Sequence, residues 1–273
     1  MAGRGRGKVA IAAFPEVRHQ LRRPKEELLA VNGSTTTNSS VDGTPQKTTD
    51  NTPDSEDLKK LCFRLKYLLS SSDSDFPKTI GAVKVAVKTK NDARSASEYM
   101  HELSQLGADQ AKITALAFVA LADWEIEGSK FRKFLLDKMQ ADFEGFKEKS
   151  QQAPNVLLCN ATFLCEVYCR YLLSGAPLKP LQGPAWEYLN FMLRSQQPFF
   201  VKHCLQIVAE HGGFLSKHGE SEMASFLDEV RSLIVEDGVE KHVRKQALKT
   251  LESSLNGWKP CASKFYEVVN GRN

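Results

Sequence analysis

The sequence predicts an all-α fold, an α-solenoid of antiparallel helix pairs that follows a disordered N-terminal tail. Two observations predict it. Apolar residues recur at helical spacing from residue 54 onward, and no segment shows convincing strand alternation. The predicted helices are roughly 12 to 20 residues long and fall into pairs of about 35 to 45 residues, joined by short turns with Gly or Pro, which is typical of a solenoid. Because no repeated motif accompanies this spacing, a globular helical bundle is the alternative.

Residues 1–53 are predicted to be a disordered tail. They carry 8 Lys or Arg against 5 Asp or Glu, and the second half of the tail is rich in Ser and Thr with almost no apolar side chains. Arg4 and Arg6 alternate with glycine, and Arg22 and Arg23 form a second basic group. These four arginines are the candidate RNA-binding residues of the tail, with a merely solvated basic end as the alternative.

Residues 54–273 are predicted to form the helical domain. Asp54 or Ser55 can cap a first helix at about 56–70. The helical periodicity then continues to Gly107, a C-terminal stop, and a short apolar helix follows at about 110–123. The apolar positions before Gly107 are Leu58, Leu61, Cys62, Leu65, Leu68, Leu69, Ile80, Val83, Val87, Ala96, Tyr99, Met100, Leu103 and Leu106.

The second half of the domain continues the pattern. A helix is expected from Phe131 to Phe146, and the segment from Val156 to Leu173 is apolar nearly all round, which predicts a central buried helix. Gly257 ends the last predicted helix. The remaining amphipathic helices are expected at about 184–195, 198–211, 221–236 and 239–256.

Composition and apolar runs set the class of protein. With 41% hydrophobic and 26% charged residues and a net charge of +4, the chain is an ordinary globular one. The longest largely apolar run, 113–122, is too short to span a bilayer, and 9–14 is too short for a signal peptide. We therefore expect a cytoplasmic protein with reduced cysteines and no membrane partner. The basic group at 22–25 leaves a nuclear pool open.

No constellation of catalytic or metal-binding residues stands out. The sequence lacks a phosphate-binding loop, a zinc-protease helix and a serine-hydrolase elbow. Cysteines 159, 165 and 169 lie in the all-apolar helix, where core packing is favoured over metal binding. Three histidines, His203, His211 and His218, lack carboxylates at ligand spacing, so we interpret them as surface or hydrogen-bonded residues. We predict no catalytic residue, no metal and no cofactor.

Lysines instead indicate a binding surface. In the helix at 239–256, Lys241, Lys245 and Lys249 recur every four residues and form a basic ridge. It is either a solvated face or a dock for an acidic protein surface or an RNA backbone. The opposite stripe is expected to pack through Val243, Ala247, Leu248, Leu251 and Leu255, and Arg244 is expected to contact Glu240.

A second and weaker basic cluster is expected in the middle of the chain. Its members are Lys130, Arg132 and Lys133. Together with the ridge it gives six candidate partner-binding residues.

Three stretches resemble the helical middle domain of eukaryotic initiation factor 4 gamma. Glu127 to Arg132, followed by Leu135, Leu136, Gln140 and Phe143, looks like the helix that opens the third repeat of that domain. The segment 162–167 looks like the buried helix that follows. The C-terminal Leu251-Glu252, Gly257-Trp258-Lys259-Pro260 and Phe265-Tyr266 are similar to the ending of smaller family members.

The resemblance implies a crescent of about five HEAT-like helix pairs. It also implies partners: a DEAD-box helicase of the initiation factor 4A type, other translation initiation factors, or RNA. We therefore hypothesise a noncatalytic adaptor in cytoplasmic translation initiation. The alternative is a direct RNA-binding protein in mRNA decay, processing or translational repression, and the oligomeric state stays open.

Overall fold

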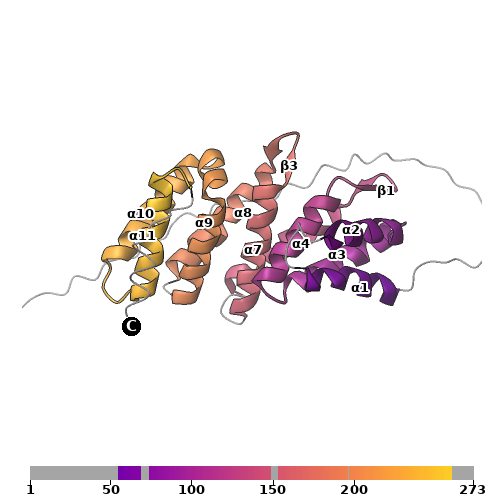
Figure 1. Ribbon diagram of the computed structural model, residues 1–273, viewed down its shortest axis with the longest axis horizontal. Coiled ribbons are helices and arrows are strands. Elements are labelled where there is room, and N and C mark those ends of the chain that lie inside the picture. Colours follow the sequence, from indigo (N-terminus) through magenta and orange to yellow (C-terminus); the bar gives the residue numbers. More distant parts are fainter. Residues whose placement is uncertain (1–54, 69–73, 149–152, 196, 260–273) are drawn as a thin grey trace, which may run out of the picture.

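The computed structural model describes residues 55–68, 74–148, 153–195 and 197–259. Its helices stack in chain order from one end of an elongated molecule to the other (Figure 1). The prediction of an all-α solenoid is thereby confirmed. The helices are α1 (Ser55–Phe63), α2 (Asp75–Ala86), α3 (Lys90–Ser104), α4 (Ala108–Leu121), α5 (Arg132–Phe143), α7 (Pro154–Arg170), α8 (Lys179–Arg194), α9 (Pro198–His218), α10 (Glu220–Val235) and α11 (Lys241–Leu255), with a 3₁₀ turn η1 (Arg64–Tyr67) after α1.

The described helices form two rows. In one row α1 packs on α3, α3 on α5 and α8 on α10; in the other α2 packs on α4, α4 on α7, α7 on α9 and α9 on α11. Each helix of the first row also contacts the helix that follows it in the second row, which gives five antiparallel pairs within the described residues. The first row and the second row are thus the two layers of the solenoid.

Three long-range hydrogen bonds join residues about 41 positions apart in the sequence. His101 bonds Asp142 at a separation of 41 residues, Thr162 bonds His203 at 41, and Trp258 bonds Ser216 at 42. The first bond joins α3 to α5, the second joins α7 to α9, and the third joins α9 to the turn that follows α11, so these bonds link successive members of a row at an offset of about one repeat. The repeat is therefore visible in the contacts although the sequence carries no repeated motif.

Helix α7 is the centre of the core. Its contact with α4 is the most extensive between any two described elements, and Cys165 and Tyr168 are fully buried. The expectation that Cys159, Cys165 and Cys169 pack in the core is confirmed, since all three are buried. Burial raises the pKa of the Cys169 thiol to about 12, so the thiol stays protonated at neutral pH.

Several predicted helix ends were wrong by a few residues. The first helix ends at Phe63 and continues only as the 3₁₀ turn, and α9 runs on to His218 instead of stopping near residue 211. Helix α7 ends at Arg170, not at Leu173. Of the predicted capping residues of the first helix, Asp54 and the side chain of Ser55 lie outside the described residues.

Two short hairpins follow α4 and α7 and were not predicted. Strands β1 (Glu125–Ile126) and β2 (Ser129–Lys130) pair antiparallel, as do β3 (Leu172–Leu173) and β4 (Ala176–Pro177). The two central residues of each turn have positive φ, 48° and 75° in the first and 53° and 81° in the second. Positive φ at both central residues is typical of a type I′ turn, the common connection of a two-residue hairpin. The segment from Glu127 to Phe131 is therefore turn and strand, and the predicted helix begins only at Arg132.

Candidate partner-binding surface

The basic ridge lies on α11, the last described helix of the second row. Lys241 and Lys249 are exposed, and Lys245 is half-buried. Within the described part of the chain, neither Lys241 nor Lys249 forms an ion pair. Their ammonium groups are therefore available to a partner.

The opposite stripe of α11 differs from the prediction. Val243 and Ala247 are buried against the neighbouring helices, as expected, but Leu248 and Leu255 are 41% and 86% exposed. The reason is that α11 packs on both α9 and α10. The buried side of the helix therefore includes Thr250, which the prediction from apolar residues had left out. Leu248 and Leu255 consequently add apolar area beside the lysines.

The predicted contact between Arg244 and Glu240 was wrong. The guanidinium donates instead to the backbone carbonyls of Glu236, at 2.9 Å, and Val239, at 3.1 Å. These carbonyls follow the last turn of α10 and have no helical N–H to bond, so a cation there satisfies them. Glu240 pairs with His242 (Nδ1 to Oε2 3.0 Å).

The second basic cluster lies on the first hairpin and at the start of α5. Lys130 of β2 forms an ion pair with Glu125 of β1 (3.0 Å). Arg132 pairs with Asp123 and also donates to the Tyr171 hydroxyl at 2.8 Å. Lys130 therefore joins the two strands of the hairpin, whereas Arg132 connects the start of α5 to the segments that follow α4 and α7.

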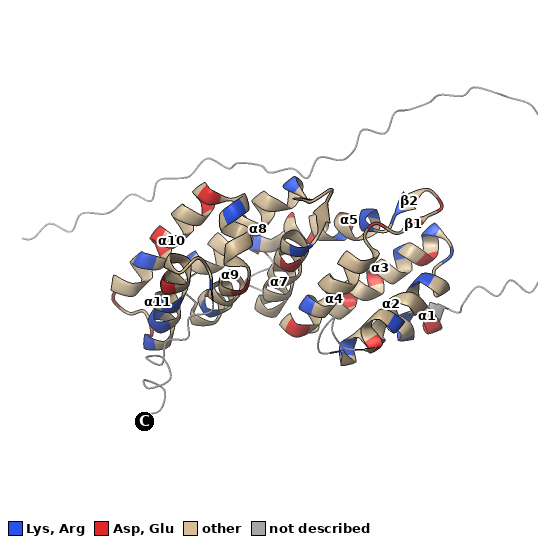
Figure 2. Cartoon of the chain, turned by 45° about the horizontal axis from the view of Figure 1, so that its top comes forward, with Lys and Arg blue, Asp and Glu red and all other residues tan. Residues whose placement is uncertain are grey.

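Lys133 is the exposed member of the second cluster, and it has no ion pair among the described residues. Figure 2 shows the hairpin near one end of the solenoid and α11 at the other. The structure therefore brings together each group of three predicted residues but not the two groups. The four tail arginines, Arg4, Arg6, Arg22 and Arg23, lie outside the described residues.

A polar seam joins α4, α7 and α9 inside the second row. Glu166 of α7, whose side chain is only 3% exposed, accepts a hydrogen bond from His211 (2.9 Å) and one from Arg170 (2.5 Å). Burial alone would raise the pKa of Glu166, but the bonds and charges of His211 and Arg170 outweigh it and lower that pKa. The interpretation of His211 as a hydrogen-bonded histidine is confirmed, and its carboxylate partner lies 45 residues away in the sequence.

Glu210 extends the seam toward solvent. Its carboxylate lies within 4.8 Å of ligand atoms of Glu166 and His211, a grouping that could hold a cation. Lys112, however, bonds both oxygens of Glu210 at 2.7 Å, and Arg170 already pairs with Glu166. The two carboxylates are neutralised by protein cations, so the arrangement favours an ion-pair network over a metal centre.

His203 continues the seam on α9. The Thr162 hydroxyl donates its proton to the Leu158 carbonyl (2.7 Å), so Nε2 of His203, 2.6 Å away, must carry a proton and donate to the Thr162 oxygen. Burial and the charge of Lys112 lower the pKa of His203 below 6.5. The interpretation of His203 as a hydrogen-bonded histidine is confirmed.

No helix of the described residues combines the length and the apolar character needed to cross a membrane.

The relatives of this chain include two proteins with informative names. It is 26% identical over 153 residues to the CBP80/20-dependent translation initiation factor of Xenopus tropicalis, which covers 55% of this chain and 26% of that protein. It is 24% identical over 151 residues to the MIF4G domain-containing protein B of Danio rerio, which covers 52% of this chain and 67% of that protein. No family model matches the chain. The match thus covers about half of this chain and about a quarter of the first relative.

Proposed function

We propose that this chain is a noncatalytic adaptor in translation initiation, whose solenoid docks a DEAD-box helicase of the initiation factor 4A type or another initiation factor. One observation carries the proposal: over about half of the chain, its sequence is similar to a protein named as a translation initiation factor and to one named for an MIF4G domain. The all-helical solenoid supports it, because such folds present long surfaces for other proteins.

The adaptor would act by positioning its partner. A solenoid that holds a two-lobed helicase fixes the relative placement of its lobes and raises its effective concentration near messenger RNA. We assign the contact to the three predicted lysines that are exposed and form no ion pair among the described residues, Lys241 and Lys249 of α11 and Lys133 of α5. Exposed Leu248 and Leu255 lie on the same helix and add apolar contact. The surface thus fits a partner that is acidic with apolar residues between its charges.

The test is calorimetric titration of the full chain with a 4A-type helicase. We expect binding in the micromolar range or tighter, and about tenfold or greater weakening in the double variant Lys241→Glu, Lys249→Glu, because each reversed charge turns attraction into repulsion. Lys245 is left unchanged, since it is half-buried. Thermal unfolding of each variant checks that the fold survives.

The matched control reverses Lys66 and Lys84, two exposed lysines at the other end of the solenoid with no ion pair among the described residues. This control should bind like the parent chain. If the helicase does not bind the parent chain, the proposed partner is wrong. If both double variants weaken binding equally, the contact is a general charge effect and the ridge is not the site.

Direct RNA binding is the second candidate function. The observation that favours it is the unpaired Lys241 and Lys249, together with a tail that carries seven basic residues in its first 25. The same titration with single-stranded RNA decides it. RNA affinity that falls steeply with salt and disappears when Arg4, Arg6, Arg22 and Arg23 become Ser, without any helicase binding, would favour this function.

A further inference from the structure

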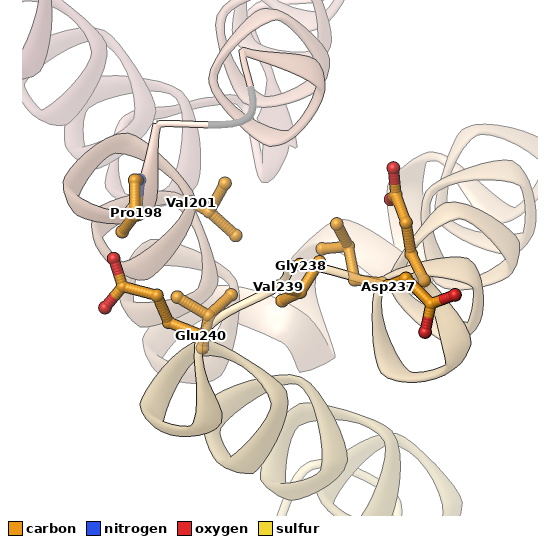
Figure 3. Close-up of a pocket in the computed structure, with 9 residues that line it drawn as sticks. Pro198, Val201, Asp237, Gly238, Val239 and Glu240 are labelled. Carbon is orange, nitrogen blue, oxygen red and sulfur yellow. The ribbon is translucent and has the colours of Figure 1, made fainter.

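A pocket of about 250 Å³ opens between the start of α9 and the loop that joins α10 to α11. Its walls are apolar and its rim is acidic. Figure 3 shows Glu240 on the Pro198 side of the pocket and Asp237 on the far side of Val239. The residues that line it are Pro198, Val201, Leu233, Glu236, Asp237, Gly238, Val239, Glu240 and Val243.

Most of the acidic residues at the rim have no basic side chain paired with them among the described residues. Glu236 and Asp237 form no ion pair among the described residues, and Glu240 pairs only with His242. Arg244, which hydrogen-bonds the loop, is occupied by the backbone carbonyls of Glu236 and Val239. Lys241 starts the next helix but does not line the pocket. The pocket therefore suits a ligand that carries both positive charge and an apolar side chain.

The apolar character extends beyond the pocket walls. Phe199 and Val235, which adjoin lining residues in sequence, are 42% and 80% exposed. Glu236, Asp237 and Glu240 are exposed. Carboxylates at a pocket rim attract guanidinium and ammonium groups more strongly once a bound ligand excludes water from them. An occupant that covers Phe199 and Val235 would provide that exclusion.

The chain itself contains a segment of the required chemistry. Residues 17–25 read Val-Arg-His-Gln-Leu-Arg-Arg-Pro-Lys, with four Lys or Arg, no Asp or Glu, and the apolar Val17 and Leu21. Such a segment offers charge to the rim and an apolar side chain to the pocket. Its proline fixes one backbone angle and so reduces the entropy that binding would cost.

The segment can also reach the pocket. Figure 1 shows α1 at one end of the solenoid and α10 and α11 at the other. Five helix pairs at a spacing of about 10 Å extend over roughly 50 Å. The residues between Lys25 and Ser55 can span up to about 100 Å when extended. Chain length therefore permits an intramolecular contact.

We propose that the acidic pocket between α9 and the α10–α11 loop binds the basic segment 17–25 of the same chain. The interaction is independent of the proposed adaptor function. Arginine and lysine side chains of the segment pair with Glu236, Asp237 and Glu240, while Leu21 or Val17 enters the apolar space between Val201 and Val239. The bound segment folds the basic tail back across the length of the solenoid.

Zero-length carbodiimide cross-linking of the full chain at low micromolar concentration tests this contact. The reagent joins an amine to a carboxylate only when the two touch, so Lys25 should link to Glu236, Asp237 or Glu240. The variant Arg18→Glu, Arg22→Glu, Arg23→Glu keeps the reactive Lys25 and every pocket carboxylate. We expect it to lower the cross-link yield at least fivefold, because the segment then repels the rim.

A pocket variant and a matched control complete the design. Val239→Arg adds bulk and positive charge to the pocket while it keeps all reactive groups, and it should lower the yield to a similar degree. Asp137→Lys, at an exposed position of α5, should leave the yield unchanged. Circular dichroism and thermal unfolding show whether each variant is folded.

Three outcomes would overturn the proposal. The first is a Lys25 cross-link pattern spread over exposed carboxylates elsewhere, such as Asp109, in the parent chain. The second is an unchanged yield in both the segment variant and a folded Val239→Arg chain. The third is found by mixing ¹⁴N and ¹⁵N chains: cross-links between light and heavy chains would mean that the pocket binds the tail of a second copy.

Discussion

Among the described glycines, Gly212 has the least room for a side chain, because Trp258 packs directly against it. The indole of Trp258 sits against the α9 backbone and donates to the Ser216 hydroxyl at 2.7 Å. A Cβ on Gly212 would lie 2.1 Å from the indole ring. Gly257, at φ 65°, follows the end of α11. Its backbone N–H donates to the Ser254 carbonyl and that of Trp258 donates to the Ser253 carbonyl, and this helix-ending pattern turns the chain toward α9.

Gly212→Ala should therefore destabilise the protein. The added methyl group expels the indole from its contact, and overpacking of this kind costs about 1–3 kcal/mol of unfolding free energy. Gly213→Ala is the matched control, because its Cβ would lie 3.7 Å from Trp258, an ordinary contact. It should be neutral or stabilise by up to about 1 kcal/mol through helix propensity. Urea denaturation measures both, and equal effects would contradict the packing argument.

At the scale of single elements, the N-terminus of α3 is the best defined. Thr89 accepts a hydrogen bond from the Asp92 backbone N–H, and the Asp92 carboxylate accepts from the backbone N–H of Thr89 at 2.9 Å. Although burial alone would raise the pKa of Asp92, the backbone bonds from Lys88 and Thr89 outweigh it and lower that pKa. Glu127 of the first hairpin accepts from the Lys90 N–H at 3.1 Å, so the hairpin also caps α3.

Thr89→Ala should lower the unfolding free energy by about 1 kcal/mol, because it leaves one N–H of the first helical turn without its partner. Thr89→Ser keeps the acceptor oxygen and should recover most of the loss. Thermal denaturation of the two variants gives the comparison. A Thr89→Ser chain as unstable as Thr89→Ala would show that the methyl group, and not the cap, is responsible.

Most helices could be predicted from the sequence, because apolar spacing and glycine stops are local signals. The stop at Gly257 and the buried α7 are examples. The hairpins could not be predicted, since each strand has only two residues and no alternation can be seen in two residues. The signal that was present is the turn: Ser174-Gly175 and Glu127-Gly128 each supply a glycine to a left-handed position.

At the scale of the whole molecule, the spacing of the helix pairs predicted the solenoid but not which side chains pair between its elements. The exposure of Lys241 and Lys249 followed from helical geometry, whereas the internal pairing of Lys130 and Arg132 depends on hairpins that were not expected. The bond between Glu166 and His211 spans 45 residues, and no local pattern reveals which of many carboxylates lies opposite a histidine. Residue identity alone therefore could not locate the seam.

The polar seam predicts how the stability of the repeats depends on pH. Glu166 has a lowered pKa in the folded protein, so its contribution to stability is present above its ordinary pKa of 4.5 and is lost as pH falls through the folded value. Glu166→Gln removes the charge that His211 and Arg170 face. At pH 7 it should lower the unfolding free energy by about 1–3 kcal/mol, the cost of leaving buried polar groups poorly paired.

The difference between parent and Glu166→Gln should shrink below pH 4.5, where the carboxylate becomes protonated in the unfolded chain, and it should disappear as the pH falls through the lower pKa of the folded state. Glu210→Gln is the control, since its side chain is 46% exposed and its pair with Lys112 is worth less than about 1 kcal/mol. Hydrogen exchange locates the effect: α7 and α9 meet at the seam, so amides of α8 to α11 should exchange faster in Glu166→Gln than those of α3. A loss of stability of equal size at pH 3.5 and pH 7 would show that the charge of Glu166 does not hold these repeats together.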